Sequence, residues 1–465
     1  MKNTKIRIQS VCIENLKNVQ HGIINFQMSA CNESSFDEAS VIGLYGQNGS
    51  GKTTVIQALD LFKRIASGMS IWTDMAECIN VDCDTSSLTL KFLIQHQNGK
   101  KLLVQYSCEF FKKNKQGKEC KLQAENLSVA YAESDGKFGR KTVIFDYKFE
   151  EVPKNIFAPK LRYNNIIKNQ SNAIQAAVAS KISYEKNASF LFSSDFFILL
   201  KDSNDNEMTE IVQILKNYAK FNLFTISNVH SGLISIDAVI PLSIKHQLKE
   251  TTAIGDIPIS QQGPIIADLQ TFEITKSVLE SMDNVIGALI PGLSIKIIEY
   301  GRELQSNGSW GIRYEVISSR QGKLIPIRYE SEGVKKILSV LNLIIAMYNN
   351  ESVCVAIDEL DAGIFEVLLG DLLKVLLESG KGQLIFTSHN LRPLEVLEKE
   401  NIYFTTTNPQ NRFIHLKAIR PTNNLRDCYI RALNLGGQDE ELATTTKLHL
   451  IRRALRKSGV TDANS

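Results

Sequence analysis

The sequence predicts an α/β fold that contains a parallel sheet. Residues 41–66 have the pattern of a short apolar strand, a glycine-rich turn and an amphipathic helix. Residues 333–388 alternate helix, strand, helix and strand, an order that is typical of a parallel sheet. Residues 87–149 alternate apolar and polar side chains between short turns, which predicts an additional antiparallel sheet.

The other segments complete four predicted parts. The N-terminal runs IRIQSVCIENLKNV and GIINF predict two β-strands joined by a turn. No heptad pattern persists through the three helical patterns of the middle region, which argues against a long coiled-coil arm. The predicted parts are an N-terminal lobe at 1–150 with the glycine-rich turn and the antiparallel sheet, a mainly helical insertion at 151–290, a C-terminal lobe at 291–435, and a basic tail at 436–465.

Composition indicates a soluble globular protein. The chain has 465 residues, of which 43% are apolar and 22% charged, and its net charge of +3 is too balanced to indicate nucleic acid by itself. The eight cysteines form no Cys-x-x-Cys pair, which argues against a zinc knuckle and favours a reducing, cytoplasmic location. The longest apolar stretches fall short of the ~20 residues that cross a bilayer, so we expect no membrane partner.

The strongest motif is the glycine-rich loop GQNGSGKT, which fits the pattern G-x-x-x-x-G-K-[ST] between a strand and a helix. Its backbone N–H groups and the helix N-terminus suit phosphate oxygens. Lys52 is expected to reach the β- and γ-phosphates of ATP, and Thr53 to hold Mg²⁺. The alternative, a turn with a structural role only, does not account for this context. The predicted nucleotide-binding residues here are Gly46, Gln47, Asn48, Gly49, Ser50, Gly51, Lys52, Thr53 and Thr54.

Two further motifs follow predicted strands. VCVAIDEL places Asp358 and Glu359 directly after an apolar run, at the carboxyl end where ligands bind in open α/β sheets. Asp358 is predicted to bind Mg²⁺ through water, and Glu359 to act as the general base toward the attacking water. QLIFTSHN places His389 just past the next strand, where its imidazole would contact the γ-phosphate and sense its loss. A lone histidine is more often a surface residue, and an acid pair after a strand is often only a strand end.

The stretch ESEGVKKIL, residues 330–338, has two interpretations. In the first, Ser331 only caps the helix that begins near Gly333. In the second, Ser331 and Gly333 contact a nucleotide that is held by a second copy of the chain.

In their order, GQNGSGKT, ESEGVKKIL, VCVAIDELDAGI and FTSHN resemble the ABC-type ATPase heads of the SMC and RecF-like class. The N-terminal strands resemble the opening of those heads. Within that class the chain is similar to stand-alone "AAA 15/21" or OLD-like ATPases, including the ATPase subunits of anti-phage systems such as Septu and PARIS. The resemblance covers residues 1–60 and roughly 290–435. It implies an ABC-type P-loop ATPase head, with a mixed sheet, helices and an antiparallel β-subdomain.

The resemblance also implies that two heads enclose two ATP molecules and hydrolyse them slowly, as a regulatory switch. Ser331 and Gly333 stand at the signature serine and second glycine, whereas Glu332 replaces the family's first glycine. Asp361 and Gly363 lie in the D-loop region, whereas the sequence does not place the Q-loop glutamine: Gln95 and Gln123 lie in the right broad region, and neither has a diagnostic context. One chain would supply Lys52, Thr53, Asp358, Glu359 and His389 to each site, and the other chain Ser331 and Gly333.

Three functions are compatible with these motifs. The first is a defence ATPase that senses a phage-derived or DNA signal and controls a separate effector, expected to be a Toprim- or HNH-type nuclease, because too little chain follows His389 for a nuclease domain. The second is a RecF/SMC-like ATPase that binds DNA in repair or chromosome maintenance. The third, a transporter subunit, fits worst, because far more residues separate Thr53 from Ser331 than such subunits carry.

The C-terminal run KLHLIRRALRKSG supplies the feature that the DNA-binding function needs. Leu448, Ile451 and Leu455 form an apolar helix face, and the basic side chains point elsewhere. A docked terminal helix with a solvated basic face is the favoured interpretation, and a phosphate-binding helix is the alternative. The other predicted partner is a second copy of the chain, which would form a homodimer at the ATP sites. The sequence does not decide between this dimer and a larger oligomer.

Overall fold

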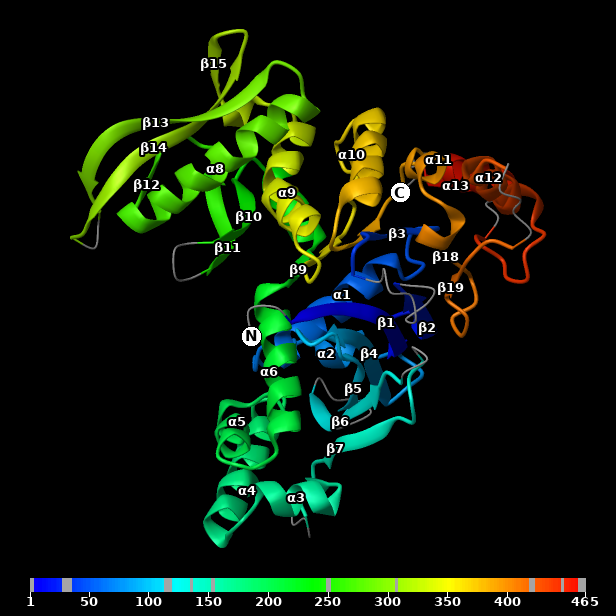
Figure 1. Ribbon diagram of the computed structural model, residues 1–465. Coiled ribbons are helices and arrows are strands. Elements are labelled where there is room, and N and C mark those ends of the chain that lie inside the picture. The colour runs from blue at the N-terminus through cyan, green and yellow to red at the C-terminus, as the bar shows by residue number, and fades with distance from the viewer. Residues whose placement is uncertain are drawn as a thin grey trace, which may run out of the picture.

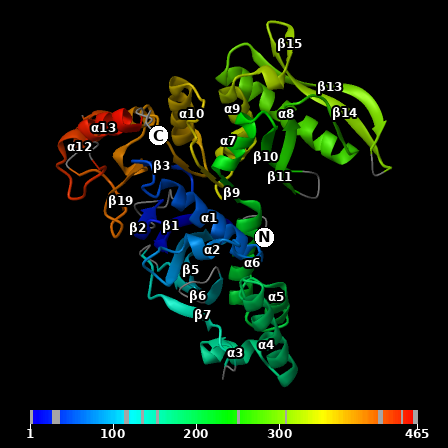
Figure 2. The ribbon, with the colours of Figure 1, turned by 180° about the vertical axis from the view of Figure 1, so that it is seen from behind.

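The computed structural model has two lobes joined by a central region (Figures 1 and 2). It describes residues 4–26, 36–112, 119–133, 137–151, 155–247, 252–305, 308–417, 423–444 and 447–458. Among the described helices, none is long and apolar enough to cross a membrane.

The central region holds a six-stranded sheet in the order β19-β18-β3-β17-β16-β9. All neighbouring pairs are parallel except β18 with β19. The residues of β3, β16 and β17 are buried throughout, as expected for apolar strands that are covered on both faces. The strands are β3 (Ser40–Tyr45), β9 (Leu223–Ile226), β16 (Cys354–Ile357), β17 (Gln383–Thr387), β18 (Ile402–Thr405) and β19 (Phe413–Ile414).

An antiparallel seven-stranded sheet lies beside the central sheet, in the order β2-β1-β4-β5-β6-β7-β8. Helix α1 (Lys52–Ala66) packs its predicted apolar face on it, and the ring of Phe62 lies 5.1 Å from that of Phe92. The predicted antiparallel sheet and N-terminal strand pair are therefore confirmed. The strands are β1 (Lys5–Leu16), β2 (Val19–Asn25), β4 (Thr85–Gln95), β5 (Lys101–Lys112), β6 (Cys120–Tyr131), β7 (Thr142–Lys148) and β8 (Phe157–Ala158).

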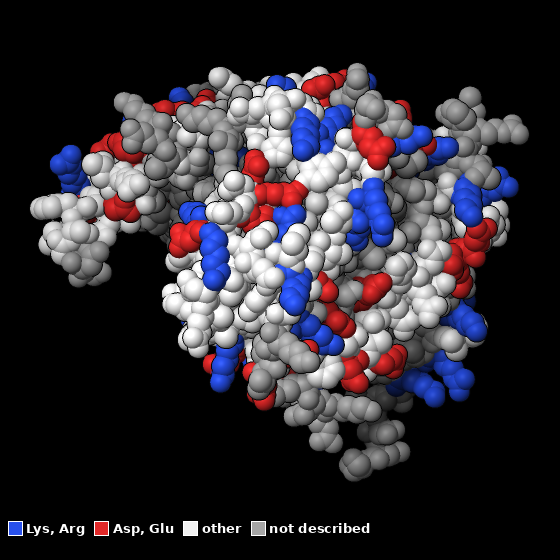
Figure 3. All heavy atoms as spheres, turned by 60° about the horizontal axis from the view of Figure 1, so that its bottom comes forward, with Lys and Arg blue, Asp and Glu red and all other residues white. Residues whose placement is uncertain are grey.

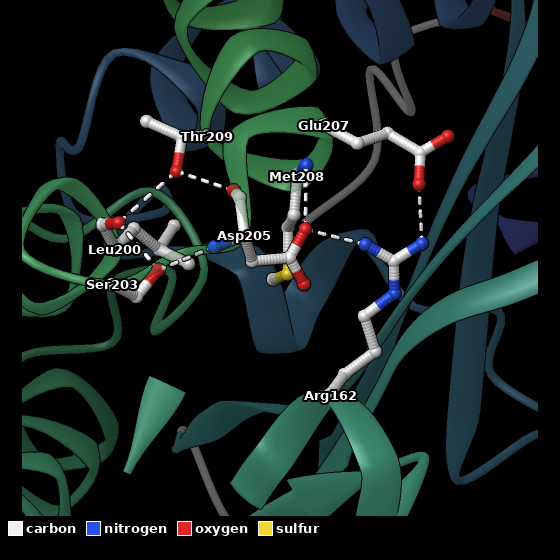
Figure 4. Close-up of polar contacts among 7 residues, drawn as sticks. All are labelled: Arg162, Leu200, Ser203, Asp205, Glu207, Met208 and Thr209. Atoms are coloured by element: carbon white, nitrogen blue, oxygen red, sulfur yellow. Dashed lines mark hydrogen bonds and ion pairs between the residues drawn. The ribbon is translucent and has the colours of Figure 1, made fainter. Parts of the chain in front are cut away.

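The lower lobe contains a helical group, α3 (Lys160–Ile166), α4 (Gln170–Glu185), α5 (Ser194–Lys201) and α6 (Asn206–Phe221) (Figure 1). Figure 4 shows polar contacts that join α3, α5 and α6. Asp205 caps α6 by accepting a hydrogen bond from the Met208 N–H at 3.2 Å, and Arg162 of α3 pairs with both Asp205 and Glu207. Since Asp205 is buried, this ion pair and cap fix α3 against the start of α6.

The upper lobe contains a sheet in the order β12-β14-β13, with β15 paired to β14, and a separate hairpin of β10 and β11. Helices α8 and α9 pack beside these strands (Figures 1 and 2). The strands are β10 (Val239–Gln247), β11 (Thr252–Ser260), β12 (Ile265–Ala267), β13 (Leu293–Leu304), β14 (Trp310–Arg320) and β15 (Lys323–Pro326). The remaining helices are α2 (Met75–Cys78), α7 (Asn228–Ser235), α8 (Leu269–Leu289), η1 (Ile327–Tyr329), α9 (Glu332–Asn349), α10 (Glu366–Ser379), α11 (Pro393–Val396), η2 (Lys399–Asn401), α12 (Leu425–Leu435) and α13 (Leu448–Ser458).

The structure divides residues 151–290 differently from the predicted helical insertion. Its first half is helical, but β9 belongs to the central sheet and pairs with β16, while β10, β11 and β12 belong to the upper lobe. The physical reason lies in β9, which is the four-residue run LFTI. A buried apolar run of that length has no periodicity that separates a strand from a helix.

Candidate functional site

The carboxyl ends of β3, β16 and β17 meet at one edge of the central sheet, because these strands are parallel and adjacent. A cavity of about 650 Å³ lies there. The predicted residues that line it together are Asn48, Gly49, Ser50, Gly51, Lys52, Thr53, Thr54, Asp358, Glu359 and His389. The fold thus brings the glycine-rich loop, the acid pair and the histidine to one place, although more than 300 residues separate Thr53 from Asp358 along the chain.

Two glycines of the glycine-rich loop lie so close to neighbouring side chains that a Cβ would collide with them. Gly46 has a φ of +147°, and a Cβ there would lie 1.7 Å from the Thr405 hydroxyl oxygen. Gly51 has a φ of +97°, and a Cβ there would lie 2.8 Å from a methyl carbon of Val19. Both positions favour glycine in conformation and in space. The loop is therefore shaped by contacts to two neighbouring segments as well as by its own sequence.

Lys52 lies inside the loop. Its Nζ donates hydrogen bonds to the carbonyl oxygens of Gly46 at 2.8 Å and Gln47 at 3.1 Å. Burial lowers the pKa of Lys52, while the negative charges of Asp358 and Glu359 act in the opposite direction. The ammonium group is therefore hydrogen-bonded to the glycine-rich loop and interacts electrostatically with the acid pair.

Thr53 and Asp358, the two residues predicted to hold Mg²⁺, lie in contact with each other. The Thr53 hydroxyl donates to Asp358 Oδ1 at 3.2 Å, and the Thr387 hydroxyl donates to the same oxygen at 2.6 Å. Asp358 is 1% exposed, and its Oδ2 is buried without a hydrogen-bond partner among the described residues. A buried carboxylate oxygen without a donor needs a cation or water. These oxygen donors fit Mg²⁺, which prefers carboxylate and hydroxyl ligands.

Glu359 lies on the cavity in an unusual backbone conformation. Its φ of 50° is in the left-handed region, which is uncommon for a residue other than glycine. The Glu359 N–H donates to the Thr387 hydroxyl at 2.8 Å. Thr387 therefore contacts both the Asp358 side chain and the Glu359 backbone. Asp361 orders the next segment, because its Oδ2 accepts hydrogen bonds from the N–H groups of His389 at 3.0 Å and Asn390 at 2.8 Å.

The sequence profile of the AAA ATPase domain family matches residues 7–392, a span that contains every residue lining the cavity. The chain belongs to this family. No curated protein matches the sequence.

Several solved structures have similar folds at low identity. An SMC head bound to the C-winged helix domain of ScpA is 13% identical, with a TM-score of 0.41, over 88% of this chain and 97% of that one. The SMC head domain from Thermotoga maritima is 13% identical, with a TM-score of 0.38, over 88% and 99%. The recombination mediator RecF with ATP is 12% identical, with a TM-score of 0.35, over 89% and 100%.

Five further residues of this ATPase-family chain line the cavity and were not predicted from its sequence. Lys17 and Asn18 come from the turn between β1 and β2, Gln57 from α1, Ala362 from the segment after β16, and Thr387 from the end of β17. Asn18 also donates a side-chain hydrogen bond to the Gly49 carbonyl oxygen. Gln95 and Gln123, the two Q-loop candidates, lie in β4 and β6 and do not line the cavity.

Ser331 and Gly333 do not line this cavity. Ser331 is exposed and caps α9, where its hydroxyl accepts from the Val334 N–H at 3.4 Å, so the first interpretation of ESEGVKKIL describes the isolated chain. Gly333 is buried against the loop after the acid pair, and a Cβ there would lie 2.1 Å from the Gly363 carbonyl oxygen. The start of α9 is thus in direct backbone contact with the segment that follows Asp358 and Glu359.

Two buried lysines lie one turn into α9, and the sequence had not singled them out. Lys335 pairs with Asp237 at 3.2 Å, and Lys336, which is 2% exposed, donates to the Ser231 hydroxyl at 2.7 Å. Burial lowers the pKa of Lys336, and the nearby charges of Glu359, Asp358 and Asp361 oppose that shift. Lys336 therefore interacts electrostatically with the same three acids as Lys52 does.

The C-terminal helix α13 is not docked, which corrects the favoured prediction. All of its described residues are exposed, including Leu448, Ile451 and Leu455. An apolar stripe on a helix shows that this face can be buried, but no described part of the chain covers it here. Figure 3 shows one other face of the molecule, where basic and acidic side chains are interspersed among the described residues. The basic side chains of α13, which are Arg452, Arg453, Arg456 and Lys457, are exposed as well.

Proposed function

We propose that the chain is an ABC-type ATP hydrolase that dimerises around ATP and controls a separate effector, a nuclease, in bacterial anti-phage defence. One observation carries the hydrolase part of this proposal. Lys52, Thr53, Asp358, Glu359 and His389 come from three separate segments and converge on one cavity. A phosphate-binding loop, a cation site and a free carboxylate in one cavity are the parts that phosphoryl transfer to water needs.

In the proposed reaction, the N–H groups of the glycine-rich loop and Lys52 bind the ATP phosphates. Thr53 and Asp358 would hold Mg²⁺, which neutralises phosphate charge when it is bound. Glu359 accepts a proton from the attacking water, and the hydrogen bond from its N–H to Thr387 keeps its backbone in place. His389 donates a hydrogen bond to the γ-phosphate and depends on Asp361 for its position.

The dimer part of the proposal rests on α9. Ser331 is exposed at the N-terminus of this 18-residue helix, where free N–H groups favour an anion, yet it contributes nothing to its own cavity. A second copy would bring Ser331 to the open side of the bound triphosphate. ATP then stabilises the dimer by binding both copies. Glu332 is exposed in the same turn, and its charge opposes the phosphate unless it turns away.

Changing Ser331 to Arg tests this arrangement. The larger cation would fill the space between the two copies, while the ATP cavity of each chain stays intact. We expect ATP to bind the Ser331→Arg monomer within about threefold of the wild-type affinity, and ATP-driven dimerisation to disappear. Light scattering after size exclusion, with and without ATP, measures the association, and a fluorescent ATP analogue measures binding.

The matched control is Asn169→Arg, since Asn169 is also an exposed helix N-cap but lies at the start of α4. Both changes cost about 1 kcal/mol of capping energy, so stability alone cannot explain a difference between them. Asn169→Arg should dimerise with ATP as the wild type does. Equal dimerisation of both variants would return Ser331 to a capping role only.

The effector part of the proposal is supported by α4. Ile174, Val178 and Ile182 lie four residues apart and are 58%, 51% and 37% exposed, so they form an apolar stripe on the outer side of the helix. The opposite side buries Ala176 and Ala179 against the lobe. A helix with apolar residues on both sides suits a partner protein on the second side. The separate nuclease of the proposal would bind there.

A second function, DNA binding in repair or chromosome maintenance, is favoured by α13. Arg452, Arg453, Arg456 and Lys457 are exposed on it, and the helix has no acidic residue. If this helix binds duplex DNA, removing residues 447–465 should weaken binding at least about tenfold and lower the dependence of affinity on salt. Titration of labelled DNA at several salt concentrations measures both. Unchanged DNA affinity and salt dependence after the truncation would count against this function.

A further inference from the structure

A cluster of metal-ligating side chains lies on the β1–β2 hairpin, outside the nucleotide cavity. Glu14 on β1 is directly opposite His21 on β2, and Cys12 is two residues before Glu14. Alternate residues of a strand share one face of the sheet, and directly opposite residues do so too. The three side chains therefore project from the same face. Their ligand atoms, one from each residue, all lie within 4.8 Å of one another.

These residues lie on the outer face of the sheet. The alternate positions Val11 and Ile13 point inward and are fully buried, whereas Cys12 and His21 are partly buried and Glu14 is exposed. Cys12 forms no disulfide. Packing in the core thus explains none of the three, and an ion can reach them from solvent.

The polar contacts within the cluster leave a ligand set available. His21 Nδ1 lies 3.7 Å from Glu14 Oε1, a distance longer than a hydrogen bond. The Ser87 hydroxyl on β4 donates to Glu14 Oε2 at 2.8 Å and so orients the carboxylate, as partners outside the ligand set do in metal sites. A Glu14–His21 ion pair alone would account for two of the residues but gives Cys12 no role.

We propose that Cys12, Glu14 and His21 bind one zinc-like transition-metal ion, with water as its fourth ligand. Thiolate, imidazole and carboxylate are the three ligand types that zinc uses, and three protein ligands plus water complete its tetrahedral coordination. The mixed soft and nitrogen donors select against Mg²⁺, which prefers oxygen. The site is therefore chemically distinct from the Thr53–Asp358 site.

An ion bound on the β1–β2 hairpin would affect the nucleotide cavity, because the turn of this hairpin lines that cavity. The turn carries Lys17 and Asn18, which line the nucleotide cavity, and Asn18 donates a hydrogen bond to the Gly49 carbonyl oxygen. An ion that joins β1 to β2 holds this turn against the glycine-rich loop. Burial and Glu14 raise the pKa of the Cys12 thiol to about 11, so ion binding displaces a thiol proton.

Cobalt titration of the metal-free protein at pH 8 tests the proposal. Co²⁺ on a thiolate gives a charge-transfer band in the near ultraviolet, which oxygen-only coordination does not. We expect one equivalent of Co²⁺ to produce this band and Zn²⁺ to remove it by displacement. Cys12→Ser should abolish the band, and His21→Ala and Ser87→Ala should weaken Zn²⁺ binding, the latter on the order of 10- to 100-fold.

Cys428→Ser is the matched control, because Cys428 is another partly buried free cysteine but lies on α12. It should keep the band. Alkylation of the wild type adds a second measurement that needs no variant, since Zn²⁺ should protect Cys12 and leave Cys428 unprotected. Lys52→Ala should bind Co²⁺ as the wild type does, so loss of nucleotide binding and loss of this site are separate results. A missing band, a band that survives Cys12→Ser, or unprotected Cys12 overturns the proposal.

Discussion

The Glu359→Gln variant is expected to bind ATP with wild-type affinity, to lose at least about a hundredfold in hydrolysis, and to accumulate as the ATP-bound dimer. Glutamine keeps the size of the side chain but cannot accept a proton from water. The backbone contact to Thr387 uses the Glu359 N–H, which the change leaves in place. Single-turnover hydrolysis and light scattering in ATP measure the two effects on the same sample.

Removing a carboxylate charge also changes the field in the cavity, so a control must separate charge from position. Glu366→Gln removes an exposed charge in the first turn of α10, outside the cavity, and should hydrolyse ATP within about twofold of the wild-type rate. If Glu359→Gln also turned over at the wild-type rate, Glu359 would not be the base. Asp361 also lines the cavity, and unlike Asp358 it has no proposed role as a cation ligand, so it would then be the next residue to change.

The site residues that the sequence predicted are the ones fixed by local geometry. A strand, a glycine-rich turn and a helix define the phosphate loop within 26 residues, from 41 to 66, and parallel strands bring Asp358 and His389 to the same edge. The residues that escaped prediction act through long-range contacts. Thr387 joins Asp358 to Glu359 from another strand, and Asn18 reaches the loop from a hairpin turn. Neither residue type has a local signature for such a role.

The features of the fold that the sequence did not specify have a similar physical origin. β9 takes its strand conformation from pairing with β16, which lies more than 100 residues later, and its own four residues do not specify it. The docking of α13 was predicted from its apolar face, but a pattern shows only that a face can be buried, not that a surface is there to bury it. Both cases needed information about distant parts of the chain.

The Lys52→Ala variant is expected to lose at least about a hundredfold in ATP affinity. Hydrogen bonds to charged groups contribute about 1.5–3 kcal/mol each, and Lys52 is placed to make more than one with the triphosphate. Its loss also removes the cation that faces Asp358, Glu359 and Asp361, so the bare carboxylates would repel the phosphates. Equilibrium binding of a fluorescent ATP analogue, with and without Mg²⁺, measures the loss.

Alanine at this position also frees the Gly46 and Gln47 carbonyl oxygens, which accept from Lys52 Nζ, so the loop itself could lose its shape. Lys52→Arg separates the two causes, because it keeps the charge but cannot fit the compact ammonium position. Lys374→Ala, on the exposed side of α10, controls for loss of a surface lysine and should leave affinity unchanged. If Lys52→Ala bound ATP as tightly as Lys374→Ala does, the cavity would not be the triphosphate site. The roles proposed for Thr53, Asp358 and Glu359 would then fail with it, because each depends on phosphates held at that loop.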